Sequence, residues 1–239
     1  MKYALSSGLA LVLILGVAPV SSDPIQIAWN DCAGAPTAAE RIEFACNQNQ
    51  GVILPIVVSF DMPPGMDRFV GVTTTIEIRT ETPTPPDWWR IESGGCRSGA
   101  LAPNLDDIVD LSGTCQSPYV GAPTGMLSFA EVLEDGAIRV ISDGARMGAS
   151  VALHEGERFV SHVFNLRVFR SVSGATPACP GCGVDATIAV KEVIVAETTG
   201  EIHLLPEGPA PTITYVGGEP GSSSPVARSS WGGIKALYR

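Results

Sequence analysis

The segment from Phe69 to Thr80 limits the fold of this chain more than any other stretch. Its residues, FVGVTTTIEIRT, are rich in β-branched side chains that alternate in character. One face of an extended chain carries Val70, Val72, Thr74, Ile76 and Ile78, and the other carries Thr73, Thr75, Glu77 and Arg79. This period of two is typical of a half-buried β-strand. We therefore predict a strand at 69–80 in a protein built from sheets.

A hairpin is predicted between residues 127 and 142. Two apolar-rich runs flank Asp135-Gly136, and Asp-Gly readily supplies the positive φ angles of a type I′ turn. The segment 159–171 also alternates, and its apolar face carries Val160, His162, Phe164, Leu166 and Val168. Further strands are expected at 52–60, 186–196, 201–205 and 212–216.

Two features modify this strand pattern. Pro55 cannot donate to a ladder, so the strand at 52–60 is expected at a sheet edge or at a bulge. Residues 37–45 offer a short helix, because Thr37 and Glu40 form a capping-box pattern. Strands that are closely spaced and joined by Gly, Pro and Asp turns predict an all-β fold. We expect an antiparallel β-sandwich of jelly-roll or immunoglobulin-like type, stapled by disulfides.

The N-terminus has the pattern of a secretory signal peptide. Met1-Lys2-Tyr3 precedes an apolar run from Ala4 to Val17, and small residues follow it. We place the signal at residues 1–22 and the sandwich domain at 23–216. No second apolar run of about eighteen residues occurs, so we expect no membrane span after signal removal. The predicted location is extracellular, at the cell surface or periplasmic.

Charge argues against two classes of partner. Removing residues 1–22 takes away one lysine and no acid, so the formal net charge changes from −10 to −11. The basic residues form no cluster, and an acidic protein of this kind is a poor ligand for nucleic acid or anionic membranes.

The C-terminal part is predicted to be a linker and a short tail. Residues 217–230 are rich in Gly, Ser and Pro and too poor in apolar residues to pack. The last nine residues, 231–239, are WGGIKALYR, which resembles the Trp-Gly-x-Ile/Val-Lys-x-Leu-Tyr/Phe-Arg tails of otherwise dissimilar secreted bacterial proteins. The resemblance implies a sorting or attachment signal that contains Trp231, Lys235, Tyr238 and Arg239. The alternative is a chain end that docks its tryptophan on the domain.

Six cysteines predict a disulfide framework in an exported chain. They are Cys32, Cys46, Cys96, Cys115, Cys179 and Cys182. Six cysteines allow fifteen pairings. Order along the sequence favours Cys32–Cys46, Cys96–Cys115 and Cys179–Cys182. The first two would close loops of roughly 15 and 20 residues, each contributing about 3 kcal/mol.

The tetrapeptide Cys179-Pro180-Gly181-Cys182 allows three interpretations. Pro and Gly in the middle favour a type II turn, whose end Cα atoms lie close enough for a structural disulfide. A zinc site would need two further ligands. A redox-active pair would need a helix N-terminus to acidify the first thiol, whereas the residues that follow are predicted to form a strand. The sequence favours the structural clip at a hairpin end.

Two constellations are candidates for binding. Trp88 and Trp89, beside Arg90, could stack on the faces of sugars or anchor a protein partner. Their alternative role is in the core. Asp106, Asp107 and Asp110 gather carboxylates that calcium could use, although they lack the spaced pattern of a calcium loop. A solvated acidic loop is the simpler interpretation of these three residues.

No catalytic motif is recognisable in the sequence. It lacks Gly-x-Ser-x-Gly, His-Glu-x-x-His and phosphate-binding loops. His162 falls on the apolar face of its strand and is predicted to be a hydrogen-bonded core residue. His154 and His203 lie in no catalytic frame. We expect no cofactor and no resident metal.

Several short motifs together resemble a group of secreted bacterial β-sandwich proteins that have no established activity. The motifs are Phe-Ala-Cys-Asn at 44–47, Asp-Trp-Trp-Arg at 87–90, Gly-Gly-Cys-Arg at 94–97 and Cys-Pro-Gly-Cys at 179–182. The resemblance implies export and architecture only. A fainter likeness to cohesin-type and carbohydrate-binding sandwiches lies at 153–159 and transfers no residue role.

The predicted role is structural or interactive, at the cell surface or in an extracellular assembly. The partner would be another protein or a second copy, reached through strand edges or the tail. The alternatives are a carbohydrate-binding module that uses Trp88 and Trp89, and a thiol–disulfide active protein that uses Cys179 and Cys182.

Overall fold

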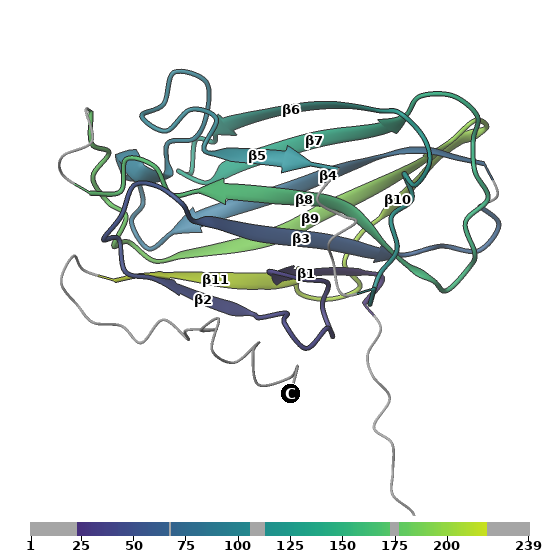
Figure 1. Cartoon of the computed structure of the whole chain (residues 1–239), viewed down its shortest axis with the longest axis horizontal. Helices are drawn as coiled ribbons and strands as arrows, with labels where there is room; N and C mark the ends of the chain where they lie inside the picture. Colours follow the sequence, from purple (N-terminus) through teal and green to yellow (C-terminus); the bar gives the residue numbers. More distant parts are fainter. Residues whose placement is uncertain (1–22, 67, 106–112, 173–176, 219–239) are drawn as a thin grey trace, which may run out of the picture.

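A computed structural model describes residues 23–66, 68–105, 113–172 and 177–218 (Figure 1). The predicted signal peptide, the three aspartates at 106, 107 and 110, and the tail 231–239 lie outside these residues. The described elements are β1 (Ile25–Trp29), β2 (Arg41–Phe44), β3 (Ile53–Asp61), β4 (Phe69–Thr80), the 3-10 helix η1 (Asp87–Trp89), β5 (Leu101–Asn104), β6 (Thr124–Val132), β7 (Ile138–Arg146), β8 (Arg158–Arg167), β9 (Ala186–Glu197), β10 (Gly200–Leu204) and β11 (Thr212–Gly217).

The strands form two packed sheets, which confirms the predicted disulfide-stapled β-sandwich. One sheet has the order β1-β3-β8-β5, and the other has the order β2-β11-β9-β4-β7-β6, with β10 also paired to β9. All pairings between these strands are antiparallel except that of β2 with β11. No helix in the described part of the chain has the length and apolarity needed to cross a bilayer.

The strand at 69–80 is confirmed as β4, and it lies in the middle of the larger sheet between β7 and β9. Ile76 and Ile78 are fully buried on its inner face, whereas Arg79 on the opposite face is exposed. The strands predicted near 159–171, 186–196, 201–205 and 212–216 are confirmed as β8 to β11. The last of these ends at Gly217, one residue beyond the predicted end of the domain.

The hairpin between β6 and β7 is confirmed, but its predicted type I′ turn is wrong. Gly136 has a φ of 80°, whereas Asp135 is not among the described residues with positive φ. The Gly136 N–H donates to the Leu133 C=O at 3.0 Å, and the Leu133 N–H donates to the Ala137 C=O at 2.7 Å. The longer loop places a single glycine in the left-handed region, as in a type I turn followed by a bulge.

The helix predicted at 37–45 is also wrong, because this segment contains β2. Thr37 does not cap a helix; its hydroxyl donates to Asp31 Oδ2 at 2.6 Å. Ala39 forms a bridge with Trp29, and β2 then runs parallel to β11. Tertiary pairing therefore overrides a local capping pattern.

Pro55 lies in an interior strand, which contradicts its predicted edge or bulge position. β3 runs between β1 and β8, and Pro55 is opposite Asn165 of β8. The β1 ladder ends at the neighbouring pair, Trp29 with Ile56. The Pro55 C=O accepts from the Asn30 N–H on that side, so the proline lies at the end of the β1 ladder, where its missing N–H omits only one bond.

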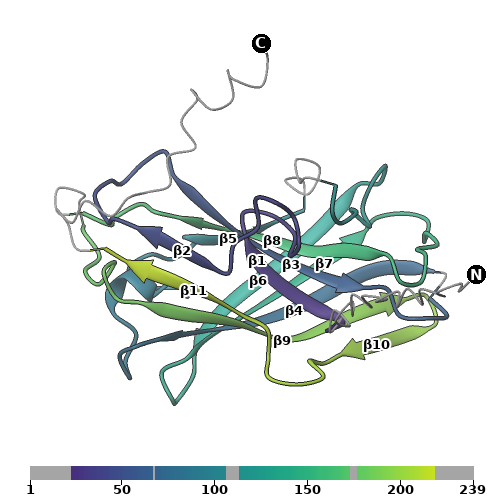
Figure 2. The same ribbon diagram turned by 90° about the horizontal axis from the view of Figure 1, so that it is seen from below.

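The two sides of the sandwich differ in how they are closed. On one side the Trp29 indole of β1 donates to the Thr214 C=O of β11 at 3.0 Å, which joins the two sheets. β2 continues that side beyond β11. On the other side the sheets end in β5 and β6, which are paired only to β8 and β7 respectively among the described strands. Figure 1 shows β6 at the side opposite β1, β2 and β11, and Figure 2 shows the latter group from below.

Candidate functional site

The predicted sugar-binding pair, Trp88 and Trp89, lies in the core. Both residues belong to η1, and both side chains are fully buried. The Trp88 ring stacks on Tyr215 at 5.2 Å between centroids, and the Trp89 ring meets the same tyrosine edge-on at 5.0 Å. The prediction that these indoles bind a ligand is wrong for this structure, because neither presents a face to solvent. Their neighbour Arg90 is exposed and pairs with Glu92 at 2.8 Å.

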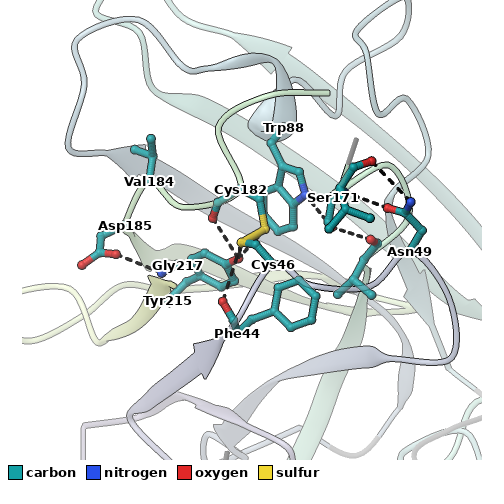
Figure 3. The surroundings of a disulfide bond; sticks show 12 residues. Phe44, Cys46, Asn49, Trp88, Ser171, Cys182, Val184, Asp185, Tyr215 and Gly217 are labelled. Carbon is teal, nitrogen blue, oxygen red and sulfur yellow. Dashed lines mark hydrogen bonds between the residues drawn. A yellow bond between two sulfur atoms is a disulfide. The ribbon is translucent and has the colours of Figure 1, made fainter. Parts of the chain in front are cut away.

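The indole N–H groups are satisfied within the protein. Trp88 Nε1 donates to the Ser171 hydroxyl at 2.9 Å, and Trp89 Nε1 donates to the Val184 C=O at 3.1 Å. The Tyr215 hydroxyl donates to the Cys182 C=O at 3.1 Å beside the Cys46–Cys182 bridge (Figure 3). Burial raises the pKa of Tyr215, so this hydroxyl stays protonated. This aromatic cluster is therefore part of the structural core.

A buried arginine packs against this aromatic cluster. Arg97 is fully buried, and its guanidinium lies 3.7 Å from the centroid of the Trp88 ring. It donates to three backbone carbonyls, those of Trp88, Phe169 and Arg167. Burial lowers the pKa of Arg97 to about 9, so the group remains charged at neutral pH. The cation–π contact and the carbonyls replace the water that burial removes.

The predicted disulfide pairings are wrong at all six cysteines. The structure pairs Cys32 with Cys115, Cys46 with Cys182, and Cys96 with Cys179, with Cα–Cα distances of 5.9 to 6.2 Å. The sequence separations are 83, 136 and 83 residues. Each bridge therefore joins segments that only the folded sandwich brings together.

The CPGC segment is neither a closed clip nor a paired redox site. Cys179 and Cys182 bond to different partners, which contradicts both the hairpin-end disulfide and the thiol–disulfide alternative. Gly181 has a φ of 101°, and its C=O accepts from the Val184 N–H at 3.1 Å, so the hydrogen-bonded turn here spans residues 181–184. The Trp88 N–H donates to the Pro180 C=O at 2.9 Å. The segment is thus the point at which two long-range bridges and the tryptophan-bearing loop meet.

His162 is confirmed as a hydrogen-bonded core residue. It is fully buried on β8, and its Nδ1 lies 2.9 Å from the Thr74 hydroxyl of β4 in the opposite sheet. Its Nε2 and the Tyr119 hydroxyl have no hydrogen-bond partner within the described residues. A Cβ at Gly144 would lie 2.6 Å from that hydroxyl and 3.2 Å from Nε2. The glycine therefore leaves the space that these two polar groups occupy.

The burial of His162 leads us to predict that the domain loses stability in mild acid. Burial lowers the pKa of His162 to about 3, whereas an unfolded histidine titrates near 6.5. As the pH falls below about 6.5, the unfolded chain takes up a proton that the folded chain does not bind until about pH 3. The free energy of unfolding is expected to fall by about 1.6 kcal/mol between pH 6.5 and pH 5. Urea unfolding at several pH values measures this slope.

The matched variants are His162→Gln and His203→Gln. Glutamine at 162 keeps a polar group for Thr74 but does not titrate, so the slope between pH 6.5 and pH 5 should become flatter. His203 on β10 is exposed and contacts Glu192 at 2.7 Å, so its replacement should leave most of the slope. An unchanged slope in His162→Gln would contradict the assignment.

The remaining predicted site residues are not described. Asp106, Asp107 and Asp110, and Trp231, Lys235, Tyr238 and Arg239 of the tail, lie outside the described ranges. Within those ranges, no group of three or more His, Cys, Asp or Glu side chains is arranged to hold a metal ion.

A strand with one free edge among the described strands is the feature that the sequence analysis missed. β6 ends the larger sheet, and we refer to residues 124–132 as the β6 edge. Eight large apolar side chains of the described residues are exposed, and six of them lie on this edge or next to it. The six are Val120, Met126, Leu127, Phe129, Val132 and Met147. The four within β6 are 40 to 68% exposed. Such a concentration of apolar surface marks an interaction site more often than a random scatter does.

The β6 edge also lacks the features that usually protect edge strands. β2 and β5 have four residues each, β5 contains Pro103, and β10 exposes Glu201. β6 has nine residues, no proline and a single charged residue, Glu131. Short length, proline and charge are the common means of preventing edge-to-edge pairing. A long edge without them is suited to pairing with another strand.

Hydrogen bonds at both ends of β6 fix the direction of its backbone groups. The Leu133 N–H donates to the Ala137 C=O at 2.7 Å, and the Met147 N–H donates to the Pro123 C=O at 2.8 Å. The register with β7 has no shift. Because backbone groups alternate in direction, the odd-numbered residues bond to β7 and the even-numbered ones point outward. The N–H and C=O groups of Met126, Ser128 and Ala130 therefore face away from the sheet.

A groove runs along the same side of the sandwich, between the end strands of the two sheets. Its walls include Leu101, Ala102 and Pro103 of β5, and Ser128, Phe129 and Ala130 of β6. The β6 edge thus offers backbone groups in the plane of the sheet and apolar side chains on both of its faces. Sequence periodicity alone could not reveal this edge, because the identity of an apolar residue does not show whether its side chain is exposed or buried.

Comparisons with known proteins leave the family of the chain open. The chain matches no protein-family model and no curated protein. Solved structures similar to it include a cohesin module of a Clostridium perfringens family 33 glycoside hydrolase, at 8% identity and a TM-score of 0.35, covering 83% of this chain and 99% of that one. The sixth cohesin of Acetivibrio cellulolyticus scaffoldin B is 10% identical, with a TM-score of 0.31 and coverages of 82% and 98%. An immunoglobulin-like protein from Nocardia farcinica is 14% identical, with a TM-score of 0.26 and coverages of 74% and 99%. At these TM-scores the likeness establishes neither a family nor a function.

Proposed function

We propose that this protein is an exported, non-catalytic interaction module that binds another protein chain along the β6 edge. The observation that supports the proposal best is a nine-residue unprotected edge that has, on it or next to it, six of the eight exposed large apolar side chains of the described residues. The partner would be a protein segment in extended conformation, because only such a segment can use the outward backbone groups of β6.

The chemistry of binding would be strand addition. An added strand hydrogen-bonds to outward N–H and C=O groups, and its alternate side chains contact the apolar residues on each face. The outward N–H and C=O groups of Met126, Ser128 and Ala130 would form these backbone hydrogen bonds. The side chains of the added strand would contact Leu127 and Phe129 on the outer face and the groove beside β5 on the inner face.

Export is part of the proposal and is supported by the disulfides. Three bridges among the described residues are typical of a protein that folds in an oxidising compartment. The N-terminal pattern at residues 1–22 agrees with this location. A tail that contains Trp231, Lys235, Tyr238 and Arg239 would then serve to sort the protein or attach it at the cell surface.

Site-specific photo-crosslinking tests the binding role. We expect p-benzoylphenylalanine in place of Phe129 to form covalent adducts with another protein chain when the exporting cells are irradiated. Phe129 is 50% exposed and is already aromatic, so the replacement should leave the fold intact. Denaturing electrophoresis with mass spectrometry of the adducts is the measurement.

Leu205 provides the matched control. It is 58% exposed and follows β10, away from the β6 edge in the sheet order. The same photo-reactive residue at position 205 should give far fewer adducts, because apolar exposure alone does not produce a specific contact. Equal yields at positions 129 and 205, or none at either, would contradict the proposed function.

A further inference from the structure

We propose that the partner of the β6 edge is a second copy of this chain, paired antiparallel about a two-fold axis at Ser128. This inference rests on the proposed function and specifies its partner. The larger sheet of one copy would continue into that of the other across two adjacent β6 strands. Such an isologous contact uses the same strand on both subunits and is closed at two copies.

The direction of the backbone groups permits this pairing. Even-numbered residues of β6 point outward, so they must form the hydrogen-bonded pairs of any antiparallel partner strand. Pairing about Ser128 places Ser128 opposite its own copy and Met126 opposite Ala130 of the second copy. Both are even-numbered pairs, and each can exchange two backbone hydrogen bonds. Ser128 and Ala130 are small residues that line the groove beside β5.

The same register matches the exposed apolar side chains. Leu127 falls opposite Phe129 of the second copy, and Phe129 falls opposite the second Leu127. These are non-hydrogen-bonded pairs, in which Cα atoms approach to about 4.5 Å and side chains are closest. Two leucine–phenylalanine contacts would therefore cover the most exposed part of the outer face.

Charge also favours this register. Glu131, the single charged residue of β6, falls opposite Gly125 of the second copy. The two copies of Glu131 lie six residues apart along the paired strands, which is about 20 Å. Within its own subunit Glu131 accepts from Arg139 at 3.4 Å. The pairing therefore brings no like charges together.

Neighbouring registers are less favourable. Pairing about Leu127 would place Phe129 opposite Gly125 and leave its ring without an apolar partner. Pairing about Phe129 would place Leu127 opposite Glu131 of the second copy. Registers centred between two residues are excluded, because they would pair even-numbered with odd-numbered residues and set outward backbone groups against inward ones. Ser128 is the centre that satisfies backbone, apolar contact and charge together.

Engineered cysteines test both the partner and the register. In S128C the two new thiols lie in a directly opposed pair, with Cα atoms about 5.5 Å apart, which is within the range of a disulfide. We expect mild oxidation of S128C to double the mass of the non-reduced chain. In E131C the two thiols would be about 20 Å apart in the proposed register, so this matched variant should remain a monomer under the same treatment.

A measurement on the unmodified protein keeps the proposal testable if either variant fails to fold. The sedimentation coefficient of the wild-type protein should rise with concentration from that of a monomer to that of a dimer, and L127K should shift this rise to higher concentration. Equal covalent dimerisation of S128C and E131C would overturn the register and the proposal, because it would indicate random collision.

The test separates this inference from the proposed function. If the wild-type protein stays monomeric and S128C does not dimerise, the second copy is not the partner. Adducts of Phe129-substituted protein with other protein chains would then leave the proposed function standing. If those adducts are also absent, both the interaction role of β6 and the self-pairing fail.

Discussion

Replacing Arg97 with alanine is expected to destabilise the domain by about 3 to 5 kcal/mol. The substitution leaves the carbonyls of Trp88, Phe169 and Arg167 without their shared donor in a buried site. It also removes the guanidinium that lies against the Trp88 ring and opens a cavity of its size. Urea unfolding monitored by tryptophan fluorescence measures the difference in the free energy of unfolding.

Two companion variants define what Arg97 contributes. Lysine at 97 keeps a charge but cannot reach three carbonyls from one planar group, so R97K should lie between wild type and R97A. Arg90 in the same loop is exposed and pairs only with Glu92 among the described ion pairs, so R90A should change stability by less than about 1 kcal/mol. An R97A protein as stable as R90A would show that the buried contacts contribute little.

Removing the Cys46–Cys182 bridge by a double substitution to alanine is expected to cost about 4 kcal/mol. The bridge closes the longest of the three loops, with a sequence separation of 136 residues. The loop-entropy relation gives about 5 kcal/mol for an isolated loop of that length. The remaining two bridges still constrain the unfolded chain, which reduces the effect. Non-reducing urea unfolding provides the measurement.

The aromatic cluster gives this prediction a second readout. The Tyr215 hydroxyl lies 3.4 Å from Cys182 Sγ, and both indoles pack on the same tyrosine ring. Loss of the bridge should therefore weaken the near-UV circular dichroism of the tryptophans. The same double substitution at Cys32 and Cys115 is the control, because the Tyr215 hydroxyl lies against the sulfurs of Cys46 and Cys182. Unchanged stability and spectrum after removal of Cys46–Cys182 would contradict the assigned role.

The secondary structure was predictable wherever local pattern and tertiary context agreed. β4 could be predicted because its alternation reports a buried and an exposed face directly. Residues 37–45 could not, because the Thr37–Glu40 pattern is local whereas the pairing of β2 with β11 joins residues more than 170 positions apart. The turn at Asp135-Gly136 was predicted, but its type depends on the length of the loop, which the sequence does not determine.

The candidate site was much less predictable than the fold. Trp88 and Trp89 attracted attention because indoles bind ligands, yet burial decides whether an indole is available, and burial is a property of the whole sandwich. Arg97 was missed for the opposite reason, since an arginine is expected at the surface. The β6 edge could not be predicted from the sequence, because the sequence does not show which strand lies at the end of a sheet.

The connectivity of the bridges has a consequence for how the chain reaches its native state. In the proposed export, the chain would enter an oxidising compartment N-terminus first and present Cys32 and Cys46 before the native partner of either had arrived. Oxidation in order of appearance would then couple consecutive cysteines and give three bonds, none of which is native. On that route, native pairing would require that oxidation be delayed until the sheets have assembled, or that wrong bonds be corrected by exchange with another thiol. The yield of this protein should depend on disulfide isomerisation capacity as much as on its own stability.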